Sequence, residues 1–431
     1  MINMIWFLFS MYWCGFVTAA PFETHQAQLQ NGLEVLLQPV QNTGEIVLQM
    51  QYNIGAGDLK ESGLPHLVEH LMFEGSKHVA NGDYDRLLQL SGGSSSAWTT
   101  HEQIVFSARF PSEALDLVLF LESDRMGWLC DGISPEDIEN QSLVVLQEYL
   151  SDSSTSDGTH DEILRLLVFG ETHPRGKSLD GDPFLLDTIT HHQVCQFAQQ
   201  WLQPSNAQLI LVGEFTVENA SERITHWFSD VAGKPVPEKQ KNGKIPRVSQ
   251  QNYSVPSSLS RLYASWPTVP FGHEDEAPLS LLFDMLVHTT EGRLNNDGVT
   301  AFGWVENDRF GGMFTVYLEG KSQLELKQWL WQALSFKCLR ESHLRPFKQR
   351  TEGAYVRALH SSFVRAKSLG KCATVGRGKD CFYWDITRRV EVTPADIIRV
   401  KNRYLHPDKA VYLSATPDVD RALPNAKKVE W

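Results

Sequence analysis

Three residues within one stretch of five have the types and the spacing for hydrolytic metal chemistry. Residues 66–70 read H-L-V-E-H, an H-x-x-E-H pattern that reverses the commoner H-E-x-x-H zinc-protease signature. On a helix, residues four apart share a face, so His66 and His70 can direct two imidazoles at one metal ion. Glu69 lies on the same side of the turn, within reach of a water molecule at that metal. Two imidazoles, a carboxylate that is not a ligand and an open metal position suit metal-assisted peptide hydrolysis. The same pattern also fits an ordinary helix whose two histidines are satisfied by protein neighbours.

The elements that must position these residues follow from the local pattern. Residues 45–54 alternate apolar and polar side chains, which predicts a strand. Pro65 suits the first turn of a helix that carries both histidines. After a break at residues 92–96, residues 97–100 and 103–107 are expected to form two further strands.

A second helix is predicted over residues 134–150. It begins with Ser134-Pro135-Glu136-Asp137, which combines an N-cap, a first-turn proline and first-turn acids. Residues 151–159 are polar and are expected to form a loop. Zinc usually takes a third protein ligand, and this helix offers one. Glu148 suits that role, although composition alone equally allows Glu139 or Glu136, and Glu148 also fits a solvated carboxylate at a helix end.

Length and charge limit the class of protein. A chain of 431 residues exceeds what one core usually fills, so two domains of about 200 residues are expected. The formal net charge of −13 argues against a nucleic-acid partner. Residues 234–258 are rich in Pro, Lys, Gln and Ser without an apolar period, which is typical of an interdomain linker. Strands and helices recur in a similar order on both sides of it, which indicates an internal duplication.

The first twenty residues resemble a secretory signal. Residues 5–17 are almost entirely apolar, and small residues precede Pro21. No Lys or Arg comes before the apolar run, so an uncleaved N-terminal membrane anchor is the alternative to an exported protein. Of the six cysteines, Cys372 and Cys381 are near enough in sequence to form a disulfide in an oxidising compartment, or else to remain buried thiols.

Residues 55–78, GAGDLKESGLPHLVEHLMFEGSKH, resemble the active-site helix of the M16 zinc peptidases, which include pitrilysin, insulysin and mitochondrial processing peptidase. Residues 141–148, QSLVVLQE, are similar to the family helix whose last Glu is the third zinc ligand. The resemblance therefore implies one Zn²⁺ held by His66, His70 and Glu148. Residues 92–102 and the closing segment 390–417 extend the likeness over nearly the whole mature chain.

The family mechanism implies that Glu69 takes a proton from a zinc-bound water and later passes it to the leaving amine. The strand at Ser96, Ala97, Trp98 and Thr99 would bind an extended peptide substrate as an added strand. The resemblance also implies an α+β fold with two homologous domains, each an antiparallel sheet covered by helices on one face. These would be residues 21–233, with the zinc site, and residues 259–431, and they would close around a chamber.

The chain departs from the family pattern at three places. Gln141 stands where the ligand helix usually has a Glu beside the metal ligands, and it brings no charge to that outer shell. Ser96 replaces an Asn, which removes a hydrogen bond to substrate worth on the order of 1 kcal/mol. The family's second half supplies an Arg and a Tyr seven residues apart, whereas this chain has Asn295 and Phe302 there.

Because processing-peptidase heterodimers divide the zinc and the Arg/Tyr pair between two chains, the resemblance implies a zinc-bearing subunit that works with an Arg/Tyr-bearing M16 partner. A self-sufficient homodimer is the alternative. A catalytically silent structural or chaperone-like M16 subunit is a further alternative, but such members usually lose the zinc motif. The expected location is outside the cytoplasm, in the bacterial periplasm.

Overall fold

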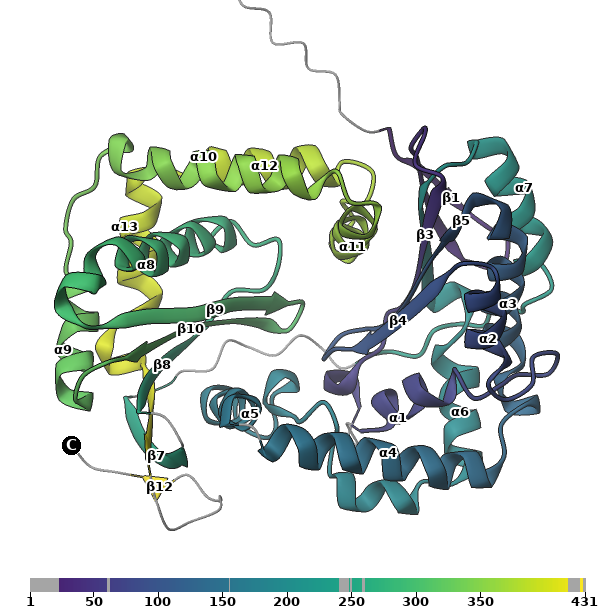
Figure 1. Ribbon diagram of the computed structural model, residues 1–431, viewed down its shortest axis with the longest axis horizontal. Coiled ribbons are helices and arrows are strands. Elements are labelled where there is room, and N and C mark those ends of the chain that lie inside the picture. Colours follow the sequence, from purple (N-terminus) through teal and green to yellow (C-terminus); the bar gives the residue numbers. More distant parts are fainter. Residues whose placement is uncertain are drawn as a thin grey trace, which may run out of the picture.

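A computed structural model of the protein describes residues 23–59, 63–154, 156–239, 248, 250–257, 260–417 and 427–428. The predicted α+β class is confirmed, because each half of the described chain consists of a six-stranded sheet with helices packed on it (Figure 1). The expected signal segment, residues 1–20, lies outside the described residues. None of the described helices combines the length and the apolar character needed to cross a bilayer.

In the first half the strands lie in the order β1-β2-β6-β3-β5-β4. The strands are β1 (His25–Gln28), β2 (Glu34–Pro39), β3 (Glu45–Tyr52), β4 (Ser94–Thr99), β5 (Ile104–Pro111) and β6 (Ala207–Gly213). The helices are α1 (Leu64–Leu71), α2 (Asp83–Leu90), α3 (Leu115–Trp128), α4 (Pro135–Ser154), α5 (Ser156–Phe169), α6 (His191–Trp201) and α7 (Val217–Phe228). The main core forms where one face of this sheet packs against α1, α3, α6 and α7.

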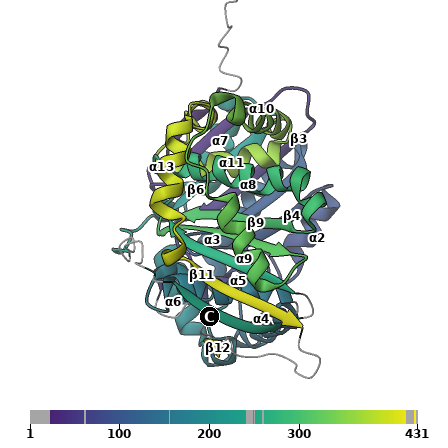
Figure 2. The same cartoon turned by 90° about the vertical axis from the view of Figure 1, so that its left-hand side faces the viewer.

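The second half repeats this plan with the strand order β12-β7-β11-β8-β10-β9. The strands are β7 (Gln251–Ser257), β8 (Arg261–Thr268), β9 (Thr300–Asp308), β10 (Gly311–Glu319), β11 (Val411–Pro417) and β12 (Lys427–Lys428). The helices are α8 (Glu276–Asp297), α9 (Gln323–Ala333), α10 (Glu341–Ala358), α11 (Ser362–Ala373), α12 (Cys381–Val390) and α13 (Pro394–Tyr404). Its core lies between the sheet and α8, α9 and α13, of which α9 and α13 are seen on the outer side in Figure 2.

The two sheets match in one further respect. Each sheet is mostly antiparallel but contains one parallel pair, β2 with β6 in the first half and β7 with β11 in the second. The shared order and the shared position of the parallel pair agree with the duplication expected from the sequence. The antiparallel description expected from the sequence is therefore correct for most strand pairs and wrong for these two.

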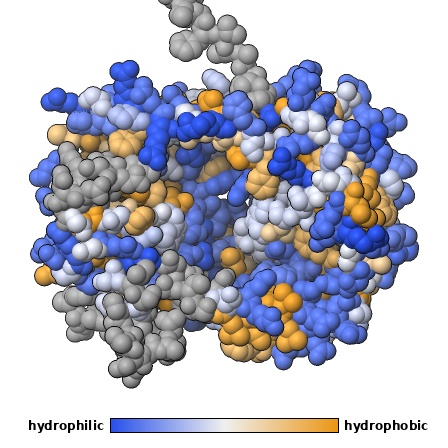
Figure 3. Space-filling model, in the orientation of Figure 1, coloured by the Kyte–Doolittle hydropathy of each residue, from blue (hydrophilic) through white to orange (hydrophobic). Residues whose placement is uncertain are grey.

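Each half covers the inner face of the other half's sheet with one helix. Helix α5 of the first half packs Leu164 and Val168 against strands of the second sheet. Helix α11 of the second half packs Ala366 and Leu369 against β3 and β6 of the first sheet. This exchange fixes the two halves around a central hollow with mostly hydrophilic visible walls (Figure 3).

Two expected boundaries differ in the structure. The polar stretch 151–159 is not a loop, because α4 continues to Ser154 and α5 begins at Ser156. Polar residues cost only some tenths of a kcal/mol each in a helix, so the apolar faces of α4 and α5 determine the outcome. Strand β7, Gln251–Ser257, forms inside the range 234–258 expected to link the domains, because its backbone pairs with β11 and β12.

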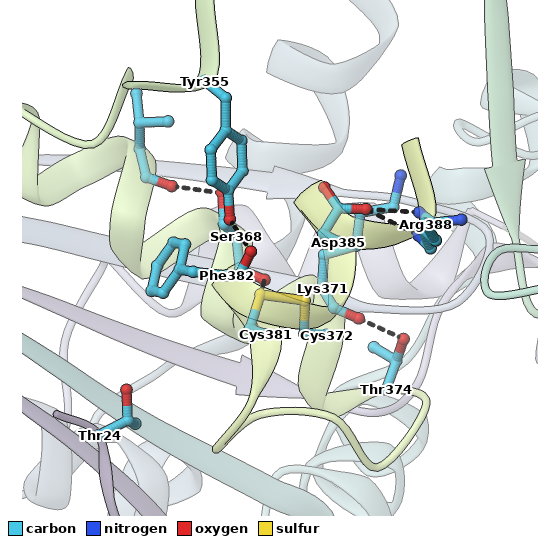
Figure 4. Close-up of a disulfide and its surroundings, with 12 residues drawn as sticks. Thr24, Tyr355, Ser368, Lys371, Cys372, Thr374, Cys381, Phe382, Asp385 and Arg388 are labelled. Carbon is cyan, nitrogen blue, oxygen red and sulfur yellow. Dashed lines mark hydrogen bonds and ion pairs between the residues drawn. A yellow bond between two sulfur atoms is a disulfide. The ribbon is translucent and has the colours of Figure 1, made fainter. Parts of the chain in front are cut away.

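Two disulfides are present among the described cysteines. Cys372 and Cys381 are joined, which links α11 to the start of α12 (Figure 4). Cys130 and Cys195 are also joined, a pairing that the sequence reasoning missed because 65 residues separate them. Cys338 is free and exposed.

Candidate metal centre

The two histidines of the H-x-x-E-H stretch lie on α1, as their spacing predicts. Pro65 occupies the first turn, where its missing N–H costs no hydrogen bond. Gly63 precedes the helix, and a Cβ there would lie 2.3 Å from the carbonyl oxygen of Asp180. The absence of a side chain at Gly63 therefore lets the loop that carries Asp180 approach the histidine face of α1.

The third residue, Glu148, reaches the same point from α4. That helix begins as expected, since Ser134 and Asp137 cap it reciprocally: the Asp137 N–H donates to Oγ of Ser134 at 3.2 Å, and the Ser134 N–H donates to the Asp137 carboxylate at 2.7 Å. Gln141 and Glu148 are seven residues apart, two turns of the helix, and both line the cavity that contains the histidines.

Three potential ligand atoms form a compact triangle. Nε2 of His66 and Nε2 of His70 are 3.2 Å apart. Oε2 of Glu148 lies 3.7 Å from Nε2 of His66 and 3.4 Å from Nε2 of His70. In a tetrahedral zinc site with ligand distances of about 2.0–2.1 Å, neighbouring ligand atoms are about 3.3–3.4 Å apart. The residues present therefore fit zinc in number, type and spacing.

Each histidine also has a partner at its other nitrogen. Nδ1 of His66 lies 2.8 Å from Oδ1 of Asp180, in a short contact that is not aligned as a hydrogen bond. Nδ1 of His70 lies 3.2 Å from Oε1 of Gln141. Acceptors at Nδ1 favour the tautomer that leaves the Nε2 lone pair for a metal ion. The arrangement of outer partners is thus the one that a histidine-based metal site needs.

Burial and neighbouring charges act differently on the two imidazoles. Burial lowers the pKa of His66, but the contact with Asp180, together with the charges of Glu69 and Glu148, outweighs burial, so the pKa of His66 is raised overall. Burial lowers the pKa of His70, and the charge of His66 adds to this. Of the pair, His70 is therefore the imidazole that is more easily kept in the neutral form a metal ion requires.

Glu69 lies against these histidines without joining the triangle of ligand atoms. Its side chain is buried, with 8% exposed, and one carboxylate oxygen accepts a hydrogen bond from the hydroxyl of Thr99. Burial raises the pKa of Glu69, and the Thr99 hydrogen bond partly opposes this. A buried carboxylate with a raised pKa is suited to taking up and returning a proton.

The triangle opens into a cavity of about 560 Å³ bounded on one side by β4. Ala97, Trp98 and Thr99 of this strand line the cavity, and Ser96 precedes them. Since β4 is the last strand of its sheet, one of its sides has no partner among the described strands. The structure therefore places an open strand edge beside the candidate metal centre.

Trp98 is also contacted by side chains of the second half. Ring centroids of Trp98 and Phe363 are 6.3 Å apart in an edge-to-face contact, and Nζ of Lys367 lies 5.4 Å from the Trp98 ring. Phe363 and Lys367 belong to α11, the helix that packs on the first sheet. The second half therefore contacts Trp98, one of the residues that line the cavity.

Sequence reasoning named His66, Glu69, His70, Gln141 and Glu148, and the structure brings them together. It missed Asp180 and Glu74, which also line the cavity. Nothing in the local sequence distinguishes Asp180 from Asp182 as a candidate site residue. Glu74 lies in the turn after α1. Its short separation from His70 in the sequence was the one signal that could have pointed to it.

Two family models match the chain. The insulinase family, peptidase family M16, matches residues 53–163, and the model described as the M16 inactive domain matches residues 188–335. The first range contains every residue of the ligand triangle, and the second spans parts of both halves.

Individual proteins described as zinc protease or processing peptidase are also similar to this chain. The chain is 26% identical over 209 residues to the zinc protease PqqE of Helicobacter pylori, covering 47% of this chain and 46% of the relative. It is 24% identical over 215 residues to a probable mitochondrial-processing peptidase subunit beta of Schizosaccharomyces pombe, covering 49% and 46%. These matches thus span about half the length of the relatives.

The fold also has solved counterparts. The crystal structure of the periplasmic protease PqqL of Escherichia coli superposes on 92% of this chain with a TM-score of 0.79 and 16% identity, and this chain covers 48% of that one. Together with the family models and the two-sheet plan, this likeness shows that the protein belongs to the M16, or insulinase, family of peptidases.

Proposed function

We propose that this protein is a zinc-dependent endopeptidase. The observation that carries the proposal is the triangle of His66, His70 and Glu148, with ligand atoms 3.2–3.7 Å apart, beside the buried carboxylate of Glu69. The zinc protease relative in Helicobacter pylori supports the choice of metal. A non-catalytic subunit would have no need of a buried carboxylate next to an intact ligand set.

The side chains divide the reaction between them. A zinc ion held by His66, His70 and Glu148 would polarise the scissile carbonyl and make the attacking water more acidic. Glu69 takes the proton from that water and returns it to the leaving amine as the peptide bond breaks. Thr99 holds the Glu69 carboxylate in place through its hydroxyl hydrogen bond. Asp180 and Gln141 orient the two imidazoles.

The substrate class follows from the open edge of β4. An extended peptide that adds to this edge at residues 96–99 would pair through its backbone, which gives affinity with little sequence preference. A segment whose backbone is already paired inside a folded protein cannot add to this edge. The proposed substrates are therefore peptides and unfolded segments of proteins.

A partner chain is part of the proposal. The second half has Asn295 and Phe302 where the family resemblance calls for an Arg and a Tyr that bind substrate. We infer that a second M16 chain supplies this pair and that the present chain is the zinc-bearing subunit of a heterodimer. The relative in Schizosaccharomyces pombe, described as a beta subunit, supports this reading. A homodimer that works without the pair is the competing arrangement.

The bounds of the two domains and the location of the protein complete the proposal. We propose a zinc-bearing domain at residues 21–233 and a second domain that runs to residue 431 and starts with β7 at Gln251, ahead of the expected start at residue 259. We propose that the protein is exported to the periplasm, on the signal-like residues 1–20 and the periplasmic description of PqqL.

Hydrolysis of an unstructured, fluorogenic peptide by the purified chain tests the proposal. The zinc-loaded wild type and Glu69→Gln are compared, each alone and after addition of an Arg/Tyr-bearing M16 chain from the same organism. We expect cleavage by the wild type, increased by the partner, and no cleavage by Glu69→Gln in either condition. Stoichiometric zinc without cleavage even with the partner would favour the non-catalytic subunit.

A further inference from the structure

Gln141 connects the metal-site histidine to a carboxylate that has been given no role. Its side-chain oxygen lies 3.2 Å from Nδ1 of His70. Its side-chain nitrogen donates a hydrogen bond to Oε1 of Glu74. The amide therefore lies between an imidazole on α1 and a carboxylate in the turn that follows α1.

The carboxylate determines which way this amide faces. An ionised carboxylate can only accept hydrogen bonds, so the amide must turn its NH₂ group toward Glu74. Its carbonyl oxygen then faces His70 and can only accept. The proton of the neutral imidazole is consequently held at Nδ1, and the lone pair of Nε2 faces the triangle of ligand atoms.

Glu74 is itself held in place. Nδ2 of Asn81 donates to Oε2 of Glu74 at 2.6 Å and lies 3.1 Å from Oδ1 of Asp137. Both oxygens of Glu74 are thus engaged, one by Gln141 and the other by Asn81. Asp137 belongs to the first turn of α4, so the same contacts fix α1 against the helix that carries Glu148.

We propose that Glu74 is a positioning residue, which sets the tautomer of His70 through the amide of Gln141. On the His70 side of the site, the negative charge of the outer shell lies one side chain farther from the metal position than a carboxylate at position 141 would place it. Gln141 therefore bridges His70 and Glu74, and Glu74 supplies the negative charge that Gln141 lacks. This inference rests on the proposed zinc function.

The proposal predicts a specific pattern of loss and rescue. In Glu74→Gln the new amide can donate as well as accept, so the Gln141 amide is free to turn over and donate to His70. That would move the imidazole proton to Nε2 and block the metal position. In the double variant Glu74→Gln/Gln141→Glu, an acceptor-only group faces Nδ1 of His70 directly, and the amide at position 74 can donate to it.

Zinc affinity, measured by competition with a chromophoric chelator, tests this without reference to activity. Glu74→Gln should bind zinc 10–100-fold more weakly than the wild type, as expected for loss of an outer-shell partner. The double variant should recover most of this loss, because an acceptor again faces Nδ1 of His70. Glu139→Gln, an exposed carboxylate on α4, is the matched control and should not change the affinity.

A second readout holds even where zinc does not bind. The ¹⁵N shifts of His70 in the metal-free protein should report the Nδ1–H tautomer in the wild type and in the double variant, and a shift toward Nε2–H in Glu74→Gln. Unchanged zinc affinity and tautomer in a folded Glu74→Gln protein would overturn the inference, as would a double variant as weak as the single one. Absence of zinc binding by the wild type would instead overturn the proposed function.

Discussion

At the scale of single residues, the candidate centre combines short-range and long-range contributions. His66 and His70 are one helical turn apart, whereas Glu148 and Asp180 arrive from distant segments and complete the site around them. The outer contacts matter because a histidine ligand must be neutral, oriented and in one tautomer.

Removing either distant carboxylate should weaken zinc binding. Glu148→Gln should lower zinc affinity by at least 10–100-fold, since it removes a ligand charge. Asp180→Asn should lower it less, by about tenfold, because it alters only the partner of His66. Equilibrium dialysis against zinc measures both changes. A Glu148→Gln protein with wild-type affinity would move the third ligand elsewhere.

Some of these site residues could be predicted from the sequence alone. The spacing of His66, Glu69 and His70 predicts a shared face on any helix. Glu148 needed the family resemblance, because Glu136 and Glu139 fitted equally well on composition. Asp180 and Glu74 could not be predicted, since their contacts depend on how the turn after α1 and a distant loop fold against the histidine helix.

At the scale of elements, the α11–α12 pair connects the second half to the first sheet. Helix α11 packs on β3 and β6, and the disulfide between Cys372 and Cys381 joins it to α12 (Figure 4). The hydroxyl of Tyr355 in α10 donates to the carbonyl of Phe382 beside this disulfide at 2.7 Å. The pair is therefore held together by contacts within the second half as well as by its packing on the first sheet.

Loss of a disulfide should destabilise the protein more when the loop it closes is longer. Replacing Cys372 and Cys381 by Ser opens a short loop and should cost about 2–3 kcal/mol, whereas replacing Cys130 and Cys195 opens a longer one and should cost about 4 kcal/mol. Denaturant unfolding measures both. Cys338→Ser is the control, since that cysteine is free and exposed. Equal losses for the three variants would contradict this ranking.

The contact between α11 and β4 should affect substrate binding more than chemistry. Phe363→Ala removes the aromatic contact on Trp98, worth about 0.5–1.5 kcal/mol, so KM should rise roughly 2–10-fold with little change in kcat. Tyr383→Ala, at an exposed ring on α12 with 69% of the residue accessible, should leave KM unchanged. Peptide kinetics on the active form of the enzyme measure both. A fall in kcat at constant KM would place Phe363 in a different role.

The pattern of apolar and polar residues predicts some of the secondary-structure elements correctly and others not. The alternation in residues 45–54 correctly predicts β3. It does not reveal that α11 covers the face of β3 that carries Gln49 and Gln51. The side-chain amide of Gln51 donates to the carbonyl of Gly370 in α11 at 3.1 Å. Polarity at 151–159 predicted a loop where two helices run. The covering helix comes from a distant segment that the pattern at 45–54 cannot reveal, and at 151–159 the apolar faces of two long helices outweigh the local polarity.

At the scale of the whole molecule, charged groups buried between the halves fix their arrangement. Arg175 pairs with Glu306 and Asp308, and Arg309 pairs with Asp58. The backbone N–H of Arg309 also donates to Glu102 across the junction at 2.8 Å. Burial, with the charge of Asp308 adding to it, raises the pKa of Glu102 to about 7.

Stability should therefore depend on pH through Glu102. The folded protein keeps this proton to a higher pH than the unfolded chain, so its contribution is present near pH 4.5 and is lost as the pH rises through about 7. Glu102→Gln removes that dependence. The difference in unfolding free energy between the two proteins should change by at most about 1.4 kcal/mol per pH unit, to the disadvantage of the wild type at higher pH. Denaturant titrations at pH 5, 6, 7 and 8 measure it, and a pH-independent difference would contradict the assignment.

The central claim, a zinc peptidase with Glu69 as the proton acceptor, is tested most directly by measuring bound zinc and peptide cleavage together in the wild type and in Glu69→Gln. We predict one zinc per chain in both proteins, with cleavage, by the chain alone or with its M16 partner, confined to the wild type. A Glu69→Gln protein that cleaves peptides at the wild-type rate, or a wild type that binds no zinc, would contradict the account.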